Sequence, residues 1–513
     1  MKEVLKMKKN ALCAMLILVL FLTACGRNRP QENEYYPLYQ SYETNVYFCT
    51  TTTVGEGILY SSEHEPTEPT IKDLFLYDLD YLMQLFEDVY FYINVLYRTS
   101  GVDIRALGEA TRDIIENYPY SMQAFAYSLG IPFEDMLELD AHIFFGTLLD
   151  EIFYPIFAFA HAQIMNHRSF RTHSTWNRAT YIPHHRFNRQ AFDNITSMRF
   201  YREMETLVNA LSANDPALFQ FYFRLDPPVV ENPEIQIVNA PVVTAEILEE
   251  GRIAYLQISS FLPEAVHVGI VNALNGGSII DFYYKIQDYE HLIIDIRNNT
   301  GGNIEFAVRN FLLPLSLEPD KLPSMPLYIL YAGSELGRYF GELQIESLRI
   351  PDYRPSHIPQ SDSLLSVEQI LNSGSLSYLN EDDLQLLSYG FRMYIDVARL
   401  NDLHHASHIP FGGRVWLLTS NRNYSASSMF TRLAKYTGFA TLVGETIGGG
   451  YAVIIATSMQ LPNTGIVVAW DANYITDVYG RTLNEFPTQP HYFNREGMDA
   501  LETVLAMIAE SRG

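Results

Sequence analysis

The sequence predicts an α/β fold preceded by a mostly helical N-terminal domain. From Ile71 to Val89, apolar residues recur at helical spacing, which indicates an amphipathic helix. Pro227, Pro228 and Pro233 then interrupt the helical pattern. Beyond these prolines, short apolar runs alternate with helical stretches, which is typical of a sheet with parallel strands. The chain has 513 residues, 48% of them hydrophobic, which is enough for one large core or two domains.

Residues 1–24 have the features of a bacterial lipoprotein signal peptide. Four lysines between Lys2 and Lys9 precede an apolar run, Ala11 to Leu22, that is too short to span a membrane as a helix. The sequence LTAC that ends at Cys25 resembles a lipobox, so we expect Cys25 to be the lipidated first residue of the mature chain. This predicts an extracytoplasmic protein of the bacterial cell envelope, anchored to the membrane only through Cys25. An ordinary signal peptide or a short anchor is the alternative.

A tether and a helical domain are expected between the anchor and the α/β core. Residues 25–70 lack periodicity and are rich in Glu, Thr, Tyr, Ser and Pro, which favours a flexible tether with a short strand near 46–51. Residues 71–225 are predicted to form the helical N-terminal domain. After its first helix, further helices are expected at 103–117, 121–129, 132–149 and 150–167.

The α/β domain is expected to span residues 248–513, with a polar insertion at about 340–410. Short apolar runs predict strands at 253–258, 291–296, 327–332, 414–419, 440–444, 452–459 and 465–470. Helical periodicity predicts helices at 265–286, from near 304 onward, at 425–437 and at 496–511.

Charge and cysteine content restrict the partners and the chemistry. The formal charge is −25 and the isoelectric point is near 4.9, which argues against nucleic acid or an anionic membrane surface as a partner. Of the three cysteines, only Cys49 lies outside the signal and lipidation sites, so no intramolecular disulfide can form. The histidines around 404–408 lack a third ligand motif, which favours a surface loop over a metal site. No cofactor-binding motif is found, and no cofactor is expected.

Two segments about 125 residues apart carry the candidate chemistry. The first, HLIIDIRNNTGGN, ends a strand in a turn with Gly301 and Gly302, whose backbone N–H groups can face a ligand closely. The second, VWLLTSNRNYSASSMF, ends a strand in a polar turn where Ser425 begins a helix. This pairing predicts a nucleophilic serine facing an oxyanion-binding loop. The alternative is that Ser425 is an ordinary helix cap.

The two segments resemble the motifs of the tail-specific, or C-terminal processing, serine proteases. DIRNNTGGN is similar to that family's D-L-R-x-N-x-G-G, and YSASSMF followed by GETIGGG is similar to its nucleophile segment and downstream glycines. IAYLQISSF also resembles the strand that precedes the family's core helix. The resemblance covers about residues 248–513 and implies an α/β core similar to the crotonase and Clp protease spiral.

The resemblance implies a role for several residues. Ser425 would be the nucleophile, and the backbone N–H groups of Gly301 or Gly302, with that of Ala426, would form the oxyanion hole. Ser427 and Ser428 are alternative nucleophiles that match the motif less well. Three polar residues of the diglycine segment would shape the site without transferring protons, namely Asp295, Arg297 and Asn299.

The general base departs from the bacterial processing enzymes, which use a lysine about 25 residues after the serine. Residues 446–450 contain no lysine, and Lys435 would lie roughly 15 Å along the same helix. The chain therefore resembles the tricorn-like, retinoid-binding-protein-like branch, in which a histidine acts as base. His161 is the favoured base, and His167 and His173 are the alternatives.

The segment LNEFPTQP resembles the family's downstream acidic motif and makes Glu485 the candidate carboxylate. The resulting hypothesis is an extracytoplasmic serine peptidase that hydrolyses peptide or protein substrates through an acyl-enzyme on Ser425. The alternative is a catalytically inactive lipoprotein that binds peptides or other ligands on the same scaffold. Residues 175–247 show no PDZ-type carboxylate-binding loop, so recognition of a substrate's C-terminus is not expected. The oligomeric state is left open.

Overall fold

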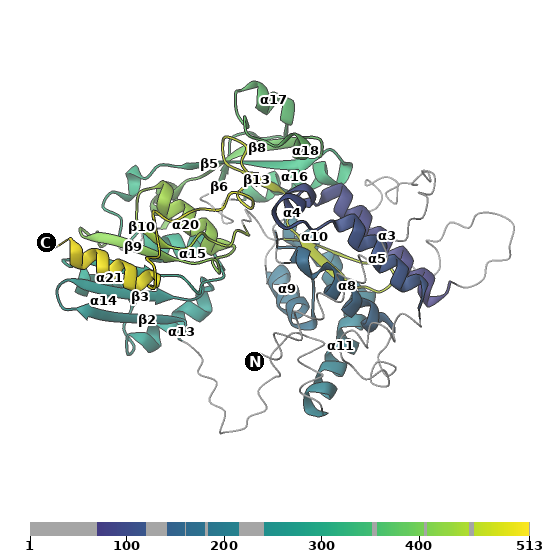
Figure 1. The fold of residues 1–513 in the computed structure, drawn as a ribbon, viewed down its shortest axis with the longest axis horizontal. Coiled ribbons are helices and arrows are strands. Elements are labelled where there is room, and N and C mark those ends of the chain that lie inside the picture. The colour runs from purple at the N-terminus through teal and green to yellow at the C-terminus, as the bar shows by residue number, and fades with distance from the viewer. Residues whose placement is uncertain are drawn as a thin grey trace. The chain divides into compact units, whose positions relative to one another are not determined.

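The computed structural model describes residues 69–118, 141–157, 159, 161–179, 183–214, 241–350, 357–404, 408–450 and 456–511 (Figure 1). The predicted signal peptide, Cys25, almost all of the tether and the helix expected at 121–129 lie outside these residues. The described chain divides into two compact units. The helical unit holds residues of 1–158, 162–233 and 457–470, and the α/β unit holds those of 159–161, 234–456 and 471–513.

Seven helices are described in the helical unit. Thr70 and Asp73 form a reciprocal capping box at the start of the first helix, which buries its apolar stripe as the periodicity predicted. No helix among the described residues is long and apolar enough to cross a membrane. The helices are α3 (Ile71–Val89), α4 (Ile93–Ser100), α5 (Ile104–Glu116), α8 (Ala141–Phe157), α9 (His167–Ala179), α10 (Pro183–Phe192) and α11 (Ile195–Asn214).

The helix expected at 103–117 is confirmed as α5, but the one expected at 150–167 is wrong beyond residue 157. Pro155 lies in the last turn of α8, where it lacks an N–H and its ring crowds the preceding turn, and the helix ends at Phe157. The chain then forms β1 (Gln163–Ile164) instead of continuing as a helix.

β1 belongs to a small antiparallel sheet with β11 (Thr457–Gln460) and β12 (Val467–Trp470), in the order β1-β12-β11. The turn between β11 and β12 is bound to α3 through Asp78, whose side chain is fully buried. Its carboxylate accepts hydrogen bonds from Asn463 N and Nδ2, at 2.9 and 3.0 Å, and from Thr464 N and Oγ1, at 2.8 and 2.7 Å. Burial raises the pKa of Asp78 to about 6, and the four donors oppose that rise.

We expect Asp78→Ala to lower the free energy of unfolding by about 2–3 kcal/mol, because buried donors would lose their acceptor. Denaturant unfolding at neutral pH measures this loss. Asp80→Ala is the matched control on the same helix. Among the described residues Asp80 forms an exposed pair with Arg112, so its loss should change the free energy by less than about 1 kcal/mol. Equal losses in the two variants would contradict the buried role of Asp78.

The α/β unit is built on a six-stranded sheet in the order β14-β10-β9-β4-β3-β2. All neighbours pair in parallel except β2 and β3, which are antiparallel at one edge. The central strands are buried on both faces, as is typical of parallel sheets, and the α/β class is confirmed. The strands are β2 (Val243–Glu249), β3 (Ile253–Ile258), β4 (His291–Asp295), β9 (Arg414–Thr419), β10 (Thr441–Gly444) and β14 (Tyr492–Phe493).

One face of this sheet is covered by the C-terminal helix α21 (Ala500–Glu510), whose Ala500, Val504 and Ile508 pack against side chains of β3, β4, β9 and β10 (Figure 1). The other helices near the sheet are α13 (Pro263–Ala273), α14 (Ile279–Ile286), α15 (Ile304–Ala307) and α20 (Ala426–Tyr436).

The single helix expected at 265–286 is wrong, since α13 and α14 are separated by a turn. Asn275 and Gly276 adopt positive φ angles of 51° and 89°, which no right-handed helix accommodates. Ser278 then caps α14.

The stretch expected as a polar insertion, about 340–410, contributes to a second sheet of the α/β unit. The order of this sheet is β13-β5-β8-β6, and β7 also pairs with β8. Its strands are β5 (Met325–Ala332), β6 (His357–Pro359), β7 (Leu365–Ser366), β8 (Leu387–Ile395) and β13 (Tyr474–Thr476). Its helices are α16 (Glu335–Leu348), α17 (Val367–Asn372), α18 (Glu381–Leu384) and α19 (Val397–His404).

Candidate active site

The two motif turns lie together at one edge of the main sheet. β4 and β9 pair in parallel, with Asp295 opposite Leu418, so both turns leave the sheet at the same end. The backbone of Gly301 lies directly against the serine turn. A Cβ atom on Gly301 would be 2.8 Å from Ser425 Cβ and 3.1 Å from Ala426 N, so only glycine fits there. Its φ of +115° also favours glycine.

Ser425 is at the N-cap position of α20, yet it does not cap the helix. A capping serine has an extended backbone and accepts a hydrogen bond from the first turn. Ser425 instead has φ 57° and ψ −127°, and its side chain forms no capping hydrogen bond. A strained turn of this kind between a strand and a helix exposes a nucleophile in hydrolases of other folds. The half-buried hydroxyl is therefore available for chemistry.

The two alternative serines are fully buried and bonded within the fold. Ser427 Oγ accepts a hydrogen bond from Asn423 Nδ2 at 3.0 Å. Ser428 Oγ donates to Gly449 O at 2.5 Å. Among the three serines, only Ser425 combines partial exposure with a strained backbone.

The diglycine loop is fixed by backbone hydrogen bonds on both sides. Phe261 N donates to Gly301 O at 2.8 Å, and a Cβ atom on Gly302 would lie 2.4 Å from Phe261 C. The Gly301 N–H donates to Asn299 Oδ1 at 2.8 Å and is therefore already used. Within the described part of the chain, no acceptor is bonded to the Gly302 N–H. Gly302 rather than Gly301 is thus the loop residue with an N–H to offer.

Asn423 joins the serine turn to the diglycine turn. Its buried amide donates to Ile296 O at 2.5 Å, to Asn299 O at 3.3 Å and to Ser427 Oγ. Its Oδ1 accepts from Ser420 N at 2.8 Å. The sequence interpretation missed this residue, although a buried-turn asparagine two positions before the serine was a readable signal.

Asp295 and Arg297 form a rigid brace below the loop. The Arg297 guanidinium bonds Asp295 Oδ2 at 2.7 Å and Asp499 Oδ2 at 2.8 Å, and Tyr255 donates to Asp295 Oδ2 at 2.7 Å. Burial alone would lower the pKa of Arg297, but the bonds and charges of the two carboxylates raise it. The Arg297 guanidinium is thereby held charged, and it is not suited to move a proton.

His161 lies beside the serine turn. Its backbone N–H donates to Tyr424 Oη at 3.0 Å, and the centroids of the two rings are 4.9 Å apart. Its Nδ1 is 2.9 Å from Asp471 Oδ2. Asp471 is fully buried, and burial raises its pKa while the neighbouring His161 lowers it. The Asp471 carboxylate thus orients the imidazole of His161, and this imidazole lies next to Tyr424, the residue directly before Ser425.

The register of a β ladder explains why Asp471 meets His161. β1 and β12 pair with Gln163 opposite Ala469, in antiparallel order. Continuing this register by two residues places His161 opposite Asp471. The sequence interpretation missed Asp471, although an acidic residue directly after the apolar run 466–470 was a signal.

The other candidate residues form the following contacts. Glu485 is the carboxylate expected from the sequence. It is half-buried in a turn, where its backbone N–H donates to Thr482 O at 3.2 Å. The carboxylate that contacts His161 Nδ1 is that of Asp471. His167 and His173 belong to α9 in the helical unit. Lys435 Nζ donates to Gln489 O at 2.7 Å.

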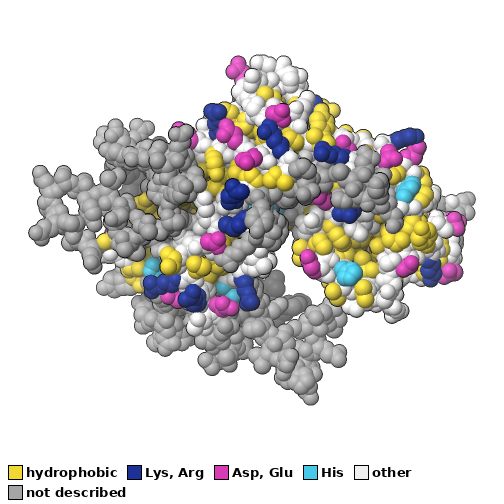
Figure 2. Space-filling model, turned by 180° about the vertical axis from the view of Figure 1, so that it is seen from behind, with side chains coloured by type: hydrophobic (Ala, Val, Ile, Leu, Met, Phe, Trp, Pro, Cys, Tyr) yellow, Lys and Arg dark blue, Asp and Glu magenta, His cyan; other side chains and the backbone are white. Residues whose placement is uncertain are grey.

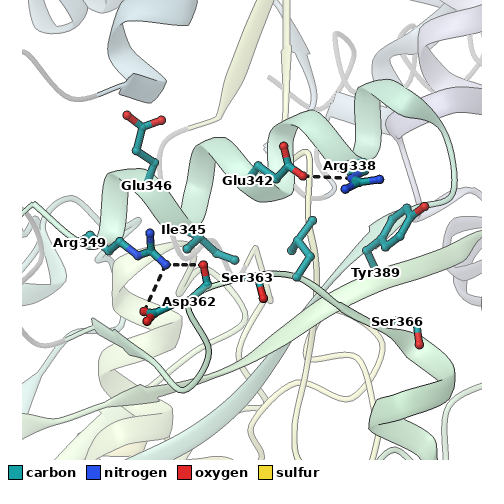
Figure 3. Close-up of a pocket in the computed structure, with 10 residues that line it drawn as sticks. Arg338, Glu342, Ile345, Glu346, Arg349, Asp362, Ser363, Ser366 and Tyr389 are labelled. Atoms are coloured by element: carbon teal, nitrogen blue, oxygen red, sulfur yellow. Dashed lines mark hydrogen bonds and ion pairs between the residues drawn. The ribbon is translucent and has the colours of Figure 1, made fainter.

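Among the described residues, no group of three or more His, Cys, Asp or Glu side chains could hold a metal ion. His408 Nε2 is bonded to Ser316 O at 2.8 Å. Acidic and basic side chains are interspersed over the face drawn in Figure 2. A hollow of about 500 Å³ lies between α16 and residues 362–366 (Figure 3). Four of its five charged residues pair with one another, Arg338 with Glu342 and Arg349 with Asp362, and none of the candidate catalytic residues lines it.

The parallel sheet, the strained serine turn and the diglycine loop define a protein with a serine-type peptidase fold. A family model described as Peptidase family S41 matches residues 252–326 and 349–492. The matched residues make up a little under half of the chain and lie mostly in the α/β unit, and this match relates the unit to the tail-specific proteases.

Solved structures of similar proteins share low identity with the chain. Mature CPAF complexed with lactacystin is 11% identical, with 86% of this chain and 97% of that chain covered and a TM-score of 0.43. A peptidase candidate from Parabacteroides merdae is 13% identical, with coverages of 85% and 96% and a TM-score of 0.40. The photosystem II D1 C-terminal processing protease is 15% identical, with coverages of 50% and 49% and a TM-score of 0.26. A sequence search of curated proteins gives no significant match.

We expect Gly301→Ala to slow the reaction of Ser425 with a fluorophosphonate probe by about 100-fold or more, because the added Cβ pushes the diglycine loop away from the serine turn. Gly251→Ala is the matched control. Gly251 also has a positive φ, of 70°, but its Cβ would meet no atom within 4 Å. Similar labelling rates in both variants would show that the close contact of the two turns is unimportant.

Proposed function

We propose that the chain is a serine peptidase that hydrolyses peptide bonds through an acyl-enzyme on Ser425. The observation that carries this proposal is the contact between the strained Ser425 turn and Gly301, with the His161–Asp471 pair beside Tyr424. A helix cap would require neither the positive φ of Ser425 nor an imidazole that a carboxylate orients beside Tyr424, the residue before Ser425.

The reaction begins when Ser425 Oγ attacks the peptide carbonyl carbon and His161 Nε2 takes the hydroxyl proton. The Nδ1–H of His161 remains bonded to Asp471, which stabilises the imidazolium that forms. Apo structures commonly hold catalytic groups further apart than the substrate complex does, so the Ser425–His161 hydrogen bond is expected to form when substrate binds.

The negative oxygen of the tetrahedral intermediate would be held by the N–H groups of Gly302 and Ala426. The Ala426 amide is the first of α20, where no intrahelical acceptor exists and the helix dipole favours negative charge. Each such donor contributes roughly 3 kcal/mol to the transition state. His161 then returns the proton to the leaving amine, and water hydrolyses the ester by the same steps.

The family match supports a peptide substrate, and the signal segment supports a location outside the cytoplasm. A peptide or protein substrate fits a peptidase of this family. The lipobox-like sequence ending at Cys25 supports an extracytoplasmic chain anchored by lipid, and fatty-acid incorporation that is lost in Cys25→Ser tests this anchor.

Ser425→Ala is expected to abolish peptide hydrolysis and fluorophosphonate labelling, because it removes the attacking oxygen. The readouts are the mass of the labelled full chain and the release of amine from a peptide library. Ser427→Ala is the matched control and should keep both, since its hydroxyl is buried against Asn423. If the wild-type chain binds peptides but is neither labelled nor active, the chain is the non-catalytic binding protein that the same scaffold allows.

The proposal assigns the orienting carboxylate to Asp471 in place of Glu485, on the strength of the 2.9 Å contact with Nδ1. We expect Asp471→Asn to lower kcat by about 10³- to 10⁴-fold with little change in KM, because the wrong imidazole tautomer is then held. Glu485→Gln should retain kcat within about 3-fold, since that carboxylate is not placed on Nδ1. The reverse ranking of the two variants would return the role to Glu485.

A further inference from the structure

Tyr424 is packed between the imidazole and a glycine backbone. Its ring centroid is 4.9 Å from that of His161, at an interplanar angle of 53°. On another side of the ring, a Cβ atom on Gly450 would lie 2.1 Å from Tyr424 Cε2, so the ring rests on a backbone that carries no side chain. The tyrosine is therefore held in one position, directly before Ser425 in the chain.

The phenol oxygen fixes the backbone of His161. His161 has φ 52°, in the left-handed region that costs a non-glycine residue free energy. Its N–H donates to Tyr424 Oη at 3.0 Å. This bond spans 263 positions of the chain and supports the strained conformation that directs the imidazole toward Tyr424 and Asp471.

Tyr424 and Asp471 each keep one polar group without a hydrogen-bond partner among the described residues. Asp471 Oδ1 is buried and has no hydrogen-bond partner within the described residues. The Tyr424 oxygen accepts the His161 N–H, and its own proton has no acceptor among the bonds of the described chain. Burial and the charge of Asp471 raise the pKa of Tyr424, so the phenol keeps its proton at neutral pH.

We propose that Tyr424 is a positioning residue for the catalytic base: its oxygen accepts the backbone N–H of His161, and its ring packs against the imidazole. This inference rests on the proposed peptidase function. It means that the nucleophile and the residue that positions its base are consecutive in one turn, so both depend on the same backbone. The described groups that titrate and contact His161 are Asp471 and Tyr424.

Tyr424→Phe tests the proposal because it removes the hydroxyl and keeps the ring. We expect kcat to fall about 10-fold with KM changed less than about 2-fold, since the hydrogen bond that holds the strained His161 backbone is lost. Tyr436→Phe is the control: this tyrosine is the last residue of α20 and about half exposed, and its change should leave kcat unchanged. An unchanged kcat in Tyr424→Phe would overturn the proposal.

A spectroscopic readout separates this proposal from the peptidase function. The Nδ1–H proton between His161 and Asp471 is expected to resonate well downfield of the amide protons in the full chain, and to vanish in Asp471→Asn. Tyr424→Phe should shift or broaden this signal, even if the chain turns out to have no peptidase activity. A signal that is the same in Tyr424→Phe and in the wild type overturns the positioning role, whereas loss of activity in Ser425→Ala alone bears only on the function.

Discussion

Parallel pairing of β4 with β9 is the constraint on which the candidate site depends. Because their carboxyl ends leave the sheet at the same edge, a turn rich in glycine and a turn that carries Ser425 must share one small volume. Only a residue without a side chain can occupy position 301, since a Cβ there would lie 2.8 Å from that of Ser425. The proposed chemistry thus depends on a packing limit as much as on the Ser425 hydroxyl.

Backbone strain accumulates at this edge and is supported by buried amides. Ser425 and His161 both have positive φ angles, and such residues cost roughly 1–3 kcal/mol each. Asn423 and Asn299 offset this cost by tying the serine turn, the diglycine turn and the end of β3 together through buried hydrogen bonds. The asparagines hold the geometry, which leaves the serine hydroxyl and the Gly302 N–H for a ligand.

The sequence predicted the strands and turns that depend on residues close together in the chain. Apolar runs predicted the strands β3, β4 and β9, and two short motifs predicted that Ser425 faces the diglycine loop, because spacing and residue type determine both. Breaks in helices were missed at Pro155 and at Asn275, where one residue overrides a periodic pattern. Asp471 was missed because its contact with His161 joins positions 310 residues apart, and no pattern in either segment indicates that the two side chains meet.

That distant contact nevertheless has a simple structural origin. Antiparallel pairing of β1 with β12 sets Gln163 opposite Ala469, and the same register sets the residues before β1 opposite those after β12. His161 and Asp471 are the pair that this register brings face to face. A two-residue strand can therefore select the carboxylate that orients an imidazole. A shift of this register by one residue would give His161 a different partner, which makes the short ladder as important to the proposed chemistry as the acidic side chain itself.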